Sequence, residues 1–315
     1  MQIDYALILS AGLGTRMGPI GKSVPKVLWP IFEKNLLELQ IAYVNSLGIR
    51  NIYVNTHYLA ELVHSQIKRM KLPTGMKIQI SHEVELLDIG GGVHQVASRP
   101  EINYTGNLFV FNCDQVLYLK KSKILEMQNL LGENSPVVLA SILVDPLMGY
   151  SGIDKKNDFM TQILSNQEIL SKNMKQMETY AGVGLIHLPS LKPISGRTKF
   201  FESVAPFEKI SVKIFEIFQE EYWDFGTVER YIYSMKKLLE LYRRQTFEES
   251  SFLNFLIKNK FLNKEKIHET SYGTKTSGII RCQNIEIWGD ELKEIIAQKK
   301  IKKSASSVLI SEERA

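Results

Sequence analysis

The chain has 315 residues, of which 44% are hydrophobic and 23% charged, and its 39 basic and 34 acidic side chains leave a net charge of +5. This composition excludes wholesale disorder and allows a full core. The charge suits an anionic substrate but is too small to predict nucleic-acid binding.

The N-terminal sequence and the cysteines indicate which classes of protein this chain does not belong to. No apolar segment approaches the ~18 residues of a membrane-spanning helix, and Asp4 interrupts the N-terminus where a signal peptide would be apolar. Cys113 and Cys282 have no metal-like spacing, so the sequence predicts neither a disulfide framework nor a zinc site. We therefore expect a cytoplasmic protein with no nucleic-acid or membrane partner.

Strands and helices alternate along the first 115 residues. The apolar run Tyr5–Leu9 is short, unbroken and followed by glycines, which is typical of a buried strand. Similar patterns predict strands at 49–55, 76–81 and 108–112, and helices at 35–47, 58–70 and 90–97. This alternation predicts an α/β fold with a mostly parallel central sheet and helices on both faces. Ligands of such sheets bind beyond the C-terminal ends of the strands.

The alternation is looser from residue 136 to about 225. The pattern there predicts a mixed, partly antiparallel extension with strands at 137–143, 160–164, 180–188 and 210–215 and a helix at 200–206, followed by a helix at 227–242. We predict a domain at 1–246, divided into halves at about 1–135 and 136–246, and a C-terminal extension at 247–315. For that extension we expect a helix at 252–258, strands at 278–280 and 285–289, and a contact between subunits of a homo-oligomer.

The loop after the first strand has the composition of an anion-binding site. Gly12 and Gly14 let the backbone turn tightly and present N–H groups with no Cβ to keep a ligand away. Arg16 and Lys26 add two cations, and Pro25 stiffens the chain before Lys26. A loop of this kind suits a triphosphate.

Two common glycine-loop patterns do not fit this loop. The dinucleotide fingerprint G-x-G-x-x-G needs a glycine where the chain has Met17, and a P-loop ending at 21–23 needs one where the chain has Arg16. Segments 9–19 and 25–30 instead match L-x-A-G-x-G-T-R-[LM]-x-P and P-K-x-L-x-P at every fixed position. The chain therefore resembles the sugar-1-phosphate nucleotidyltransferases, also called NDP-sugar pyrophosphorylases.

This resemblance implies a Rossmann-like three-layer αβα nucleotidyltransferase fold, with Arg16 and Lys26 as catalytic cations. Segment 86–92 resembles the family's L-x-T-G-G-[GA], which packs against the base and the sugar, and Glu83 or Glu85 is a candidate to accept a hydrogen bond from the base. The residues implied in nucleotide binding are Leu9, Ala11, Gly12, Gly14, Thr15, Glu83, Gly90 and Gly91.

Two aspartates are candidate ligands for Mg²⁺. Nucleotidyl transfer depends on positioning and charge neutralisation, which call for a divalent metal and basic side chains. Asp114 follows the predicted strand at 108–112, and Mg²⁺ takes one or two carboxylates beside phosphate oxygens. Segment 222–227 resembles the family's aromatic-x-D-x-G-T, which implies that Asp224 is the second ligand. Thr227 is suited to cap the helix that follows.

The predicted acceptor half resembles the family less closely. Segment 152–156 partly matches the Glu-Lys pair that relatives carry after a G-[VI]-[VI] strand, which makes Asp154 a candidate to hold sugar hydroxyls and Lys155 or Lys156 a candidate to hold the sugar phosphate. Gly182 keeps the glycine of the family's N-x-G, but Tyr180 replaces its asparagine. Asp154 and Gly182 are the predicted sugar-phosphate-binding residues.

The sequence thus predicts an Mg²⁺-dependent enzyme that condenses a nucleoside triphosphate with a sugar 1-phosphate, with uridylyl or guanylyl transfer favoured. Two alternatives stay open. A cytidylyltransferase acting on a phosphorylated alcohol shares the glycine loop, although the element at 224–227 argues against it. A non-catalytic nucleotide-sugar sensor is suggested by Tyr180, although the complete set of cations and aspartates argues for catalysis.

Overall fold

The computed structural model describes residues 3–17, 21–22, 24–172, 174–217, 221–244 and 250–262, and the backbone of three short strands beyond them. No helix in these ranges is both long and apolar enough to cross a membrane.

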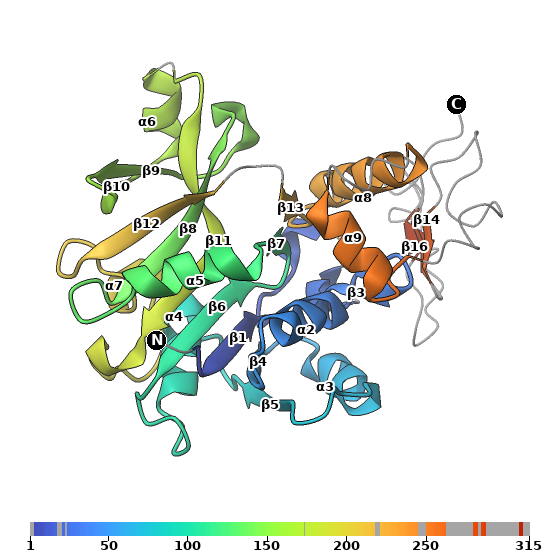
Figure 1. The fold of residues 1–315 in the computed structure, drawn as a ribbon, viewed down its shortest axis with the longest axis horizontal. Coiled ribbons are helices and arrows are strands. Elements are labelled where there is room, and N and C mark those ends of the chain that lie inside the picture. Colours follow the sequence, from blue (N-terminus) through green and yellow to red (C-terminus); the bar gives the residue numbers. More distant parts are fainter. Residues whose placement is uncertain are drawn as a thin grey trace.

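A nine-stranded sheet runs through the molecule in the order β5-β4-β1-β6-β11-β8-β12-β10-β9 (Figure 1). The strands nearest the N-terminal loop, β5, β4, β1 and β6, are parallel to one another. β11 and β10 run opposite to the other strands of this sheet, so the sheet is mixed, as predicted. The strands are β1 (Tyr5–Leu9), β4 (Asn51–Thr56), β5 (Lys77–His82), β6 (Asn107–Asn112), β8 (Val137–Val144), β9 (Gly152–Lys156), β10 (Phe159–Leu164), β11 (Met177–His187) and β12 (Val212–Ile217).

Helices cover both faces of the sheet and make the predicted three-layer αβα arrangement (Figure 1). One face, here called the α2 face, packs against α2 (Leu36–Ser46), α3 (Ala60–Arg69) and α5 (Lys121–Leu130). The other, here called the α4 face, packs against α4 (Asp88–Ala97) and α7 (Phe200–Ser203). Alternate residues of each strand point to opposite faces, so each strand contributes to both cores.

Side-chain caps fix where two helices beside the site begin. Asn35 and Glu38 form a reciprocal capping box at the start of α2, in which each side chain accepts a hydrogen bond from the other residue's N–H. Thr227 Oγ1 accepts from Arg230 N at 3.3 Å at the start of α8 (Val228–Arg243), as the capping prediction required. The N-cap of α8 therefore lies three residues after Asp224, and the helix itself starts at the next residue.

Several short elements were not predicted. The strand β7 (Gln115–Leu117) pairs with β13 (Tyr222–Asp224) in a separate two-stranded sheet, and β2 (Pro30–Ile31) pairs with β3 (Lys34–Asn35). α5 and α6 (Asn166–Ser171) were also missed. Strands of two or three residues carry no measurable period, so only their long-range pairing defines them.

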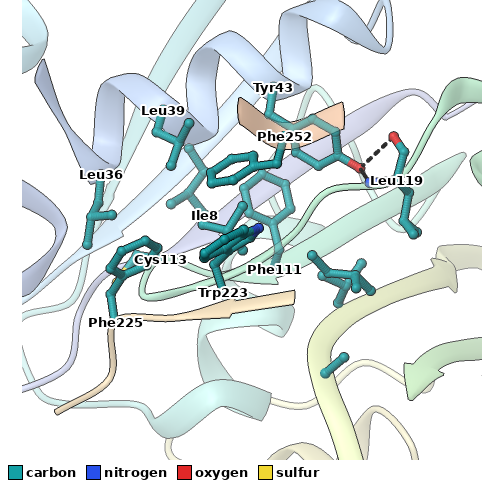
Figure 2. Packing of buried hydrophobic residues seen from close by; sticks show 14 of the residues in the cluster. Ile8, Leu36, Leu39, Tyr43, Phe111, Cys113, Leu119, Trp223, Phe225 and Phe252 are labelled. Atoms are coloured by element: carbon teal, nitrogen blue, oxygen red, sulfur yellow. Dashed lines mark hydrogen bonds between the residues drawn. The ribbon is translucent and has the colours of Figure 1, made fainter. Parts of the chain in front are cut away.

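The helix α9 (Ser251–Lys258) packs into the core of the α2 face. Figure 2 shows Phe252 from α9 facing Trp223 of β13, with Tyr43 of α2 beside them, and the Trp223 and Phe252 ring centroids are 5.5 Å apart. Phe252 and Phe261 are fully buried. The domain boundary after residue 246 stays a prediction, but this core continues to residue 262.

Three short strands follow: β14 (Ile280–Cys282), β15 (Ile285–Ile287) and β16 (Leu309–Ile310) form one small sheet. β15 lies within the strand predicted at 285–289, whereas β14 shares only Ile280 with the strand predicted at 278–280. The rest of 263–315, where we expect a homo-oligomer contact, lies outside the described residues.

Candidate active site

A cavity of about 300 Å³ lies at the C-terminal ends of β1, β4 and β6, on the α4 face. Its walls are the loop after β1, the polar residues that end or follow the neighbouring strands, and the connection from β5 to α4. The predicted residues that line it are Leu9, Ala11, Gly12, Gly14, Thr15, Arg16, Lys26, Glu83 and Asp114.

The loop after β1 folds tightly on itself. Gly14 has a φ of +64°, in the left-handed region that glycine adopts more readily than other residues. Its carbonyl accepts a hydrogen bond from Met17 N at 2.9 Å. A Cβ at Gly21 would overlap the Gly14 carbonyl, so the glycine that imitates a P-loop has a packing role. A Cβ at Gly12 would meet open space, which leaves this side of the loop accessible to a ligand.

Two basic side chains line the cavity: Lys26 is bound to other residues of the chain, and Arg16, within the described residues, is not. Lys26 Nζ donates to Asp114 Oδ2 at 2.7 Å and to the Gly226 carbonyl at 2.8 Å, so it joins the two predicted metal-binding segments. Arg16 is exposed and has no hydrogen bond or ion pair within the described part of the chain. Its five N–H donors are therefore available to phosphate oxygens.

The ladder between β7 and β13 places Asp224 beside Asp114. Asp224 stands opposite Gln115, and Phe225 N donates to the Asp114 carbonyl at 2.8 Å. A Cβ at Gly226 would lie 2.8 Å from Asp224 Oδ1 and 3.5 Å from Asp114 Oδ2. The two aspartates that the sequence pairs by resemblance therefore face the same small space.

That space fits a small divalent cation. It is open only because Gly226 has no side chain, and the carboxylates of Asp114 and Asp224 border it with 13% and 7% of their side chains exposed. No cluster of three or more potential metal ligands occurs among the described residues. A pair of carboxylates suits Mg²⁺, because this ion usually binds one or two protein carboxylates. Phosphate oxygens and water occupy its other coordination positions.

Asp224 is held by three hydrogen-bond donors. Gly226 N donates to Oδ1 at 2.6 Å, Arg230 Nη1 donates to Oδ2 at 2.9 Å, and the Tyr150 hydroxyl also donates to Oδ2. Burial and the adjacent charge of Asp224 raise the pKa of Tyr150 well above its ordinary value. The phenol therefore stays protonated and keeps donating to Asp224.

At another edge of the cavity a buried carboxylate is fixed by polar neighbours. Glu83 is 1% exposed, and its two oxygens accept from Asn55 Nδ2 at 2.8 Å and from Leu87 N at 2.9 Å. Asn55 Oδ1 in turn accepts from Ser10 N at 2.6 Å. Burial raises the pKa of Glu83, and these hydrogen bonds offset part of that increase. This edge offers fixed acceptors to the N–H groups of a planar base.

Comparison with known proteins agrees with this geometry. Residues 5–150 match the family model described as Nucleotidyl transferase. This chain contains a nucleotidyl transferase domain.

Relatives of the domain act on sugar phosphates, according to their names. Mannose-1-phosphate guanylyltransferase catalytic subunit beta of Danio rerio is 22% identical over 77% of this chain and 67% of its own length. N-acetylmuramate alpha-1-phosphate uridylyltransferase of Caulobacter vibrioides is 35% identical, over 35% of this chain and 46% of its own length. The crystal structure of HddC from Yersinia pseudotuberculosis shares the fold, with a TM-score of 0.60 and 22% identity over 75% of this chain and 99% of that one.

In the nucleotidyl transferase domain, two predicted nucleotide-binding glycines lie away from the cavity. α4 begins at Asp88, two residues before the predicted start at 90, so the three glycines lie inside the helix. A Cβ at Gly90 would lie 2.5 Å from the Lys199 carbonyl, and one at Gly91 would lie 2.5 Å from the Gly196 carbonyl. The helical period turns these two glycines towards the segment before α7. Gly92 instead borders Asn55 and Glu83.

The two predicted sugar-phosphate residues lie in different places. A Cβ at Gly182 would lie 2.9 Å from Nδ2 of Asn112, which lines the cavity, and Gly182 has a φ of +75°. Asp154 lies on the edge strand β9 and pairs with Lys172 at 3.5 Å, so the structure does not bring it to the cavity. Lys155, considered for the sugar phosphate, pairs with Glu178 at 2.9 Å and Glu216 at 3.1 Å.

Sequence reasoning missed several residues of the domain's site. Asn55 and Asn112 line the cavity, and each lies at or near the C-terminal end of a parallel strand, which is the signal that could have identified them. Tyr150 and Arg230 hold Asp224: Tyr150 comes from a distant segment and has no local signal, whereas Arg230 lies one helical turn and a short loop after Asp224. A cation in the first turn of α8 opposes the helix dipole, and its pairing with Asp224 explains its place.

Proposed function

We propose that this chain condenses a nucleoside triphosphate with a sugar 1-phosphate to give a nucleoside diphosphate sugar and pyrophosphate. The observation that carries the proposal is that one cavity holds the open glycine loop, Arg16, Lys26 and Asp114 together. The relatives' names support the same reaction class.

In this reaction an oxygen of the sugar phosphate attacks the α-phosphorus in line. A new P–O bond forms, the bond between the α-phosphorus and the bridging oxygen breaks, and pyrophosphate leaves with that oxygen. The exposed guanidinium of Arg16 neutralises charge on the departing phosphates. Lys26, fixed by Asp114 and the Gly226 carbonyl, holds the α-phosphate against the attacking phosphate.

Asp114 and Asp224 are the residues that would hold Mg²⁺, which when bound supplies positive charge to the phosphate oxygens. The chain's own contribution is to keep that place open and its ligands oriented. Gly226 provides the space by lacking a side chain, and Arg230 and Tyr150 fix the orientation of the Asp224 carboxylate.

The base lies between the glycine loop and Glu83 in this proposal. Guanine and uracil both carry ring N–H groups that a fixed carboxylate can accept from, and the relatives transfer guanylyl or uridylyl groups by name. GTP and UTP are therefore the first donors to test. We also place the activity in the cytoplasm, where nucleoside triphosphates are available.

A second candidate, a non-catalytic nucleotide-sugar sensor, is favoured by one observation. Each predicted metal-binding aspartate already pairs with a cation, Asp114 with Lys26 and Asp224 with Arg230. The deciding experiment measures pyrophosphate release with Mg²⁺ for each common nucleoside triphosphate against a panel of sugar 1-phosphates. Release with one pair establishes the transferase. No release across the panel, together with a nucleotide sugar that raises the melting temperature, would establish the sensor instead.

A further inference from the structure

The two carboxylate oxygens of Asp224 lie in different surroundings. Oδ1 borders the space that Gly226 leaves open, since a Cβ at Gly226 would lie 2.8 Å from it. Asp114 Oδ2 borders the same space, 3.5 Å from that Cβ position. Asp224 Oδ2 lies no closer to this position than the carboxyl carbon, which is 3.8 Å away. Asp224 therefore presents one oxygen, Oδ1, to the candidate metal site.

The other oxygen, Oδ2, is taken up by two hydrogen-bond donors. Arg230 Nη1 donates to it at 2.9 Å, and the Tyr150 hydroxyl donates to the same atom. A carboxylate oxygen offers about two lone-pair positions, so these donors fill both. The Asp224 side chain is only 7% exposed, which limits the water that could replace either donor. A metal ion could use Oδ2 only by displacing Tyr150 or Arg230.

Tyr150 and Arg230 also hold each other in place. The guanidinium of Arg230 lies over the Tyr150 ring, 4.2 Å from its centroid, which is a cation–π distance. Arg230 Nη2 donates to the Met148 carbonyl, so the arginine is bound to the segment between β8 and β9 that carries Tyr150. Displacing either donor from Oδ2 would break a hydrogen bond to a buried charge together with this packing. The arrangement therefore keeps Oδ2 closed to a metal ion.

Mg²⁺ and Ca²⁺ place different demands on a carboxylate. Mg²⁺ needs a near-octahedral shell and binds one or two carboxylates beside phosphate oxygens and water. Ca²⁺ takes about six to eight oxygens at longer distances, and one carboxylate can give it both oxygens. No cluster of three or more potential metal ligands lies within the described ranges, so no further acidic side chain there compensates for a closed Oδ2. A site in which Asp224 gives one oxygen therefore suits Mg²⁺ better than Ca²⁺.

We propose that Tyr150 and Arg230 are specificity-determining residues, which make the candidate metal site select Mg²⁺ against Ca²⁺ by occupying Asp224 Oδ2. The inference rests on the proposed function for the presence of a divalent cation. Neither Tyr150 nor Arg230 contacts the ion or the reacting phosphates; both act through the single oxygen that they leave to Asp224. Both lie outside segments 108–114 and 222–227, which carry the two candidate ligands.

The first test measures metal binding to the full chain and needs no turnover. Mn²⁺ binding is followed by electron paramagnetic resonance, and Mg²⁺ or Ca²⁺ is added as the competitor. We expect Mg²⁺ to displace bound Mn²⁺ at a lower concentration than Ca²⁺ does, because the site offers Ca²⁺ too few oxygens. Asp114→Asn should abolish the binding, which shows that the displaced ion occupies this site. Displacement by Ca²⁺ at an equal or lower concentration would overturn the inference.

The second test frees Oδ2 by substitution. Tyr150→Phe removes one donor without changing the charge, and Tyr150→Phe combined with Arg230→Met removes both donors. We expect the ratio of the Ca²⁺ to the Mg²⁺ dissociation constant to fall in Tyr150→Phe, and to fall about tenfold in the double variant, a factor typical of one hydrogen bond to a charged group. The ratio cancels the lost charge of Arg230, which acts equally on two divalent ions. Tyr233→Phe, at an exposed tyrosine of α8, is the matched control and should leave the ratio unchanged.

These outcomes separate ion selectivity from a structural role and from the proposed function. If Tyr150 and Arg230 only support the fold, their variants weaken the binding of Mn²⁺, Mg²⁺ and Ca²⁺ alike, and the unchanged ratio overturns the inference. Tyr150→Phe alone decides the question if the double variant unfolds. Absence of pyrophosphate release across the substrate panel refutes the transferase but does not alter this competition. Absence of Mn²⁺ binding to the unmodified protein would refute the inference together with the metal assignment.

Discussion

The two halves of the sheet place their polar residues in opposite ways. In the half built from β5, β4, β1 and β6, the strands are parallel and their ends converge on one cavity, where Arg16 remains available to a ligand. The other half is built from β11, β8, β12, β10 and β9, and its strand directions are mixed. Charged side chains there pair with one another, as Lys155 does with Glu178 and Glu216.

This difference explains why the residues that line the cavity in the first half can be predicted from the sequence, whereas the charged contacts of the second half cannot. A parallel strand followed by a loop puts the binding groups within a few residues of each other, as in the loop from Gly12 to Arg16. In the second half, a carboxylate from β11 meets a lysine from β9, and no short segment contains both. Local patterns therefore identify the cavity residues of the first half, whereas the contacts of the second half depend on tertiary pairing.

The largest expected effect comes from the nucleotide half. Asp114→Asn removes a charge that Lys26 and the proposed metal share, and we expect pyrophosphate formation to fall by about 1,000-fold while the melting temperature changes little. Asp145→Asn is the control, because Asp145 is an exposed aspartate that only caps a turn by accepting from Leu147 N. Near-normal turnover of Asp114→Asn with Mg²⁺ would show that the metal assignment is wrong.

The second effect tests whether the core of the nucleotide half depends on residues past 246. Phe252→Ala empties a fully buried site against Trp223, and we expect it to lower the free energy of unfolding by about 3–5 kcal/mol. Tyr233→Ala, at a side chain that is 66% exposed on α8, should change it by no more than about 0.5 kcal/mol. Urea denaturation measures both, and equal small losses would place α9 outside the core.

A third effect tests how tightly the aspartates are arranged. Gly226→Ala would push a Cβ between Asp224 and Asp114, so we expect turnover to fall by about 100-fold. Binding of Mn²⁺, followed by electron paramagnetic resonance, should weaken in parallel. Gly132→Ala, where a Cβ meets open space, serves as the control. Unchanged Mn²⁺ binding in Gly226→Ala would contradict a metal site at this place.

The smallest effect is expected where sequence and structure disagree. Asp154→Ala removes an exposed ion pair with Lys172 on the edge of the acceptor half, so we expect less than a twofold change in any KM and about 0.5 kcal/mol or less in stability. Steady-state kinetics with both substrates measures this. A large rise in the KM for the sugar 1-phosphate would restore Asp154 as a sugar-binding residue.

The pairing of Asp114 with Asp224 was implied only by the family resemblance, because the two lie far apart in the chain and the ladder between β7 and β13 brings them together. The sequence by itself determined the fold class and the glycine loop with its two cations. Each of these depends on short-range physics: apolar periodicity sets the strands, glycine permits the turn, and the fixed spacing of the loop puts Arg16 after Gly14. Such features can be predicted from the sequence because the residues that form them are close together in the chain.

The tertiary structure alone decided what surrounds those features. It turned Gly90 and Gly91 towards α7, brought Tyr150 onto Asp224, and kept Asp154 on the edge strand β9, away from the cavity. Each of these outcomes depends on which elements pack together, and the free energy of that packing is summed over the whole core and not over any one segment.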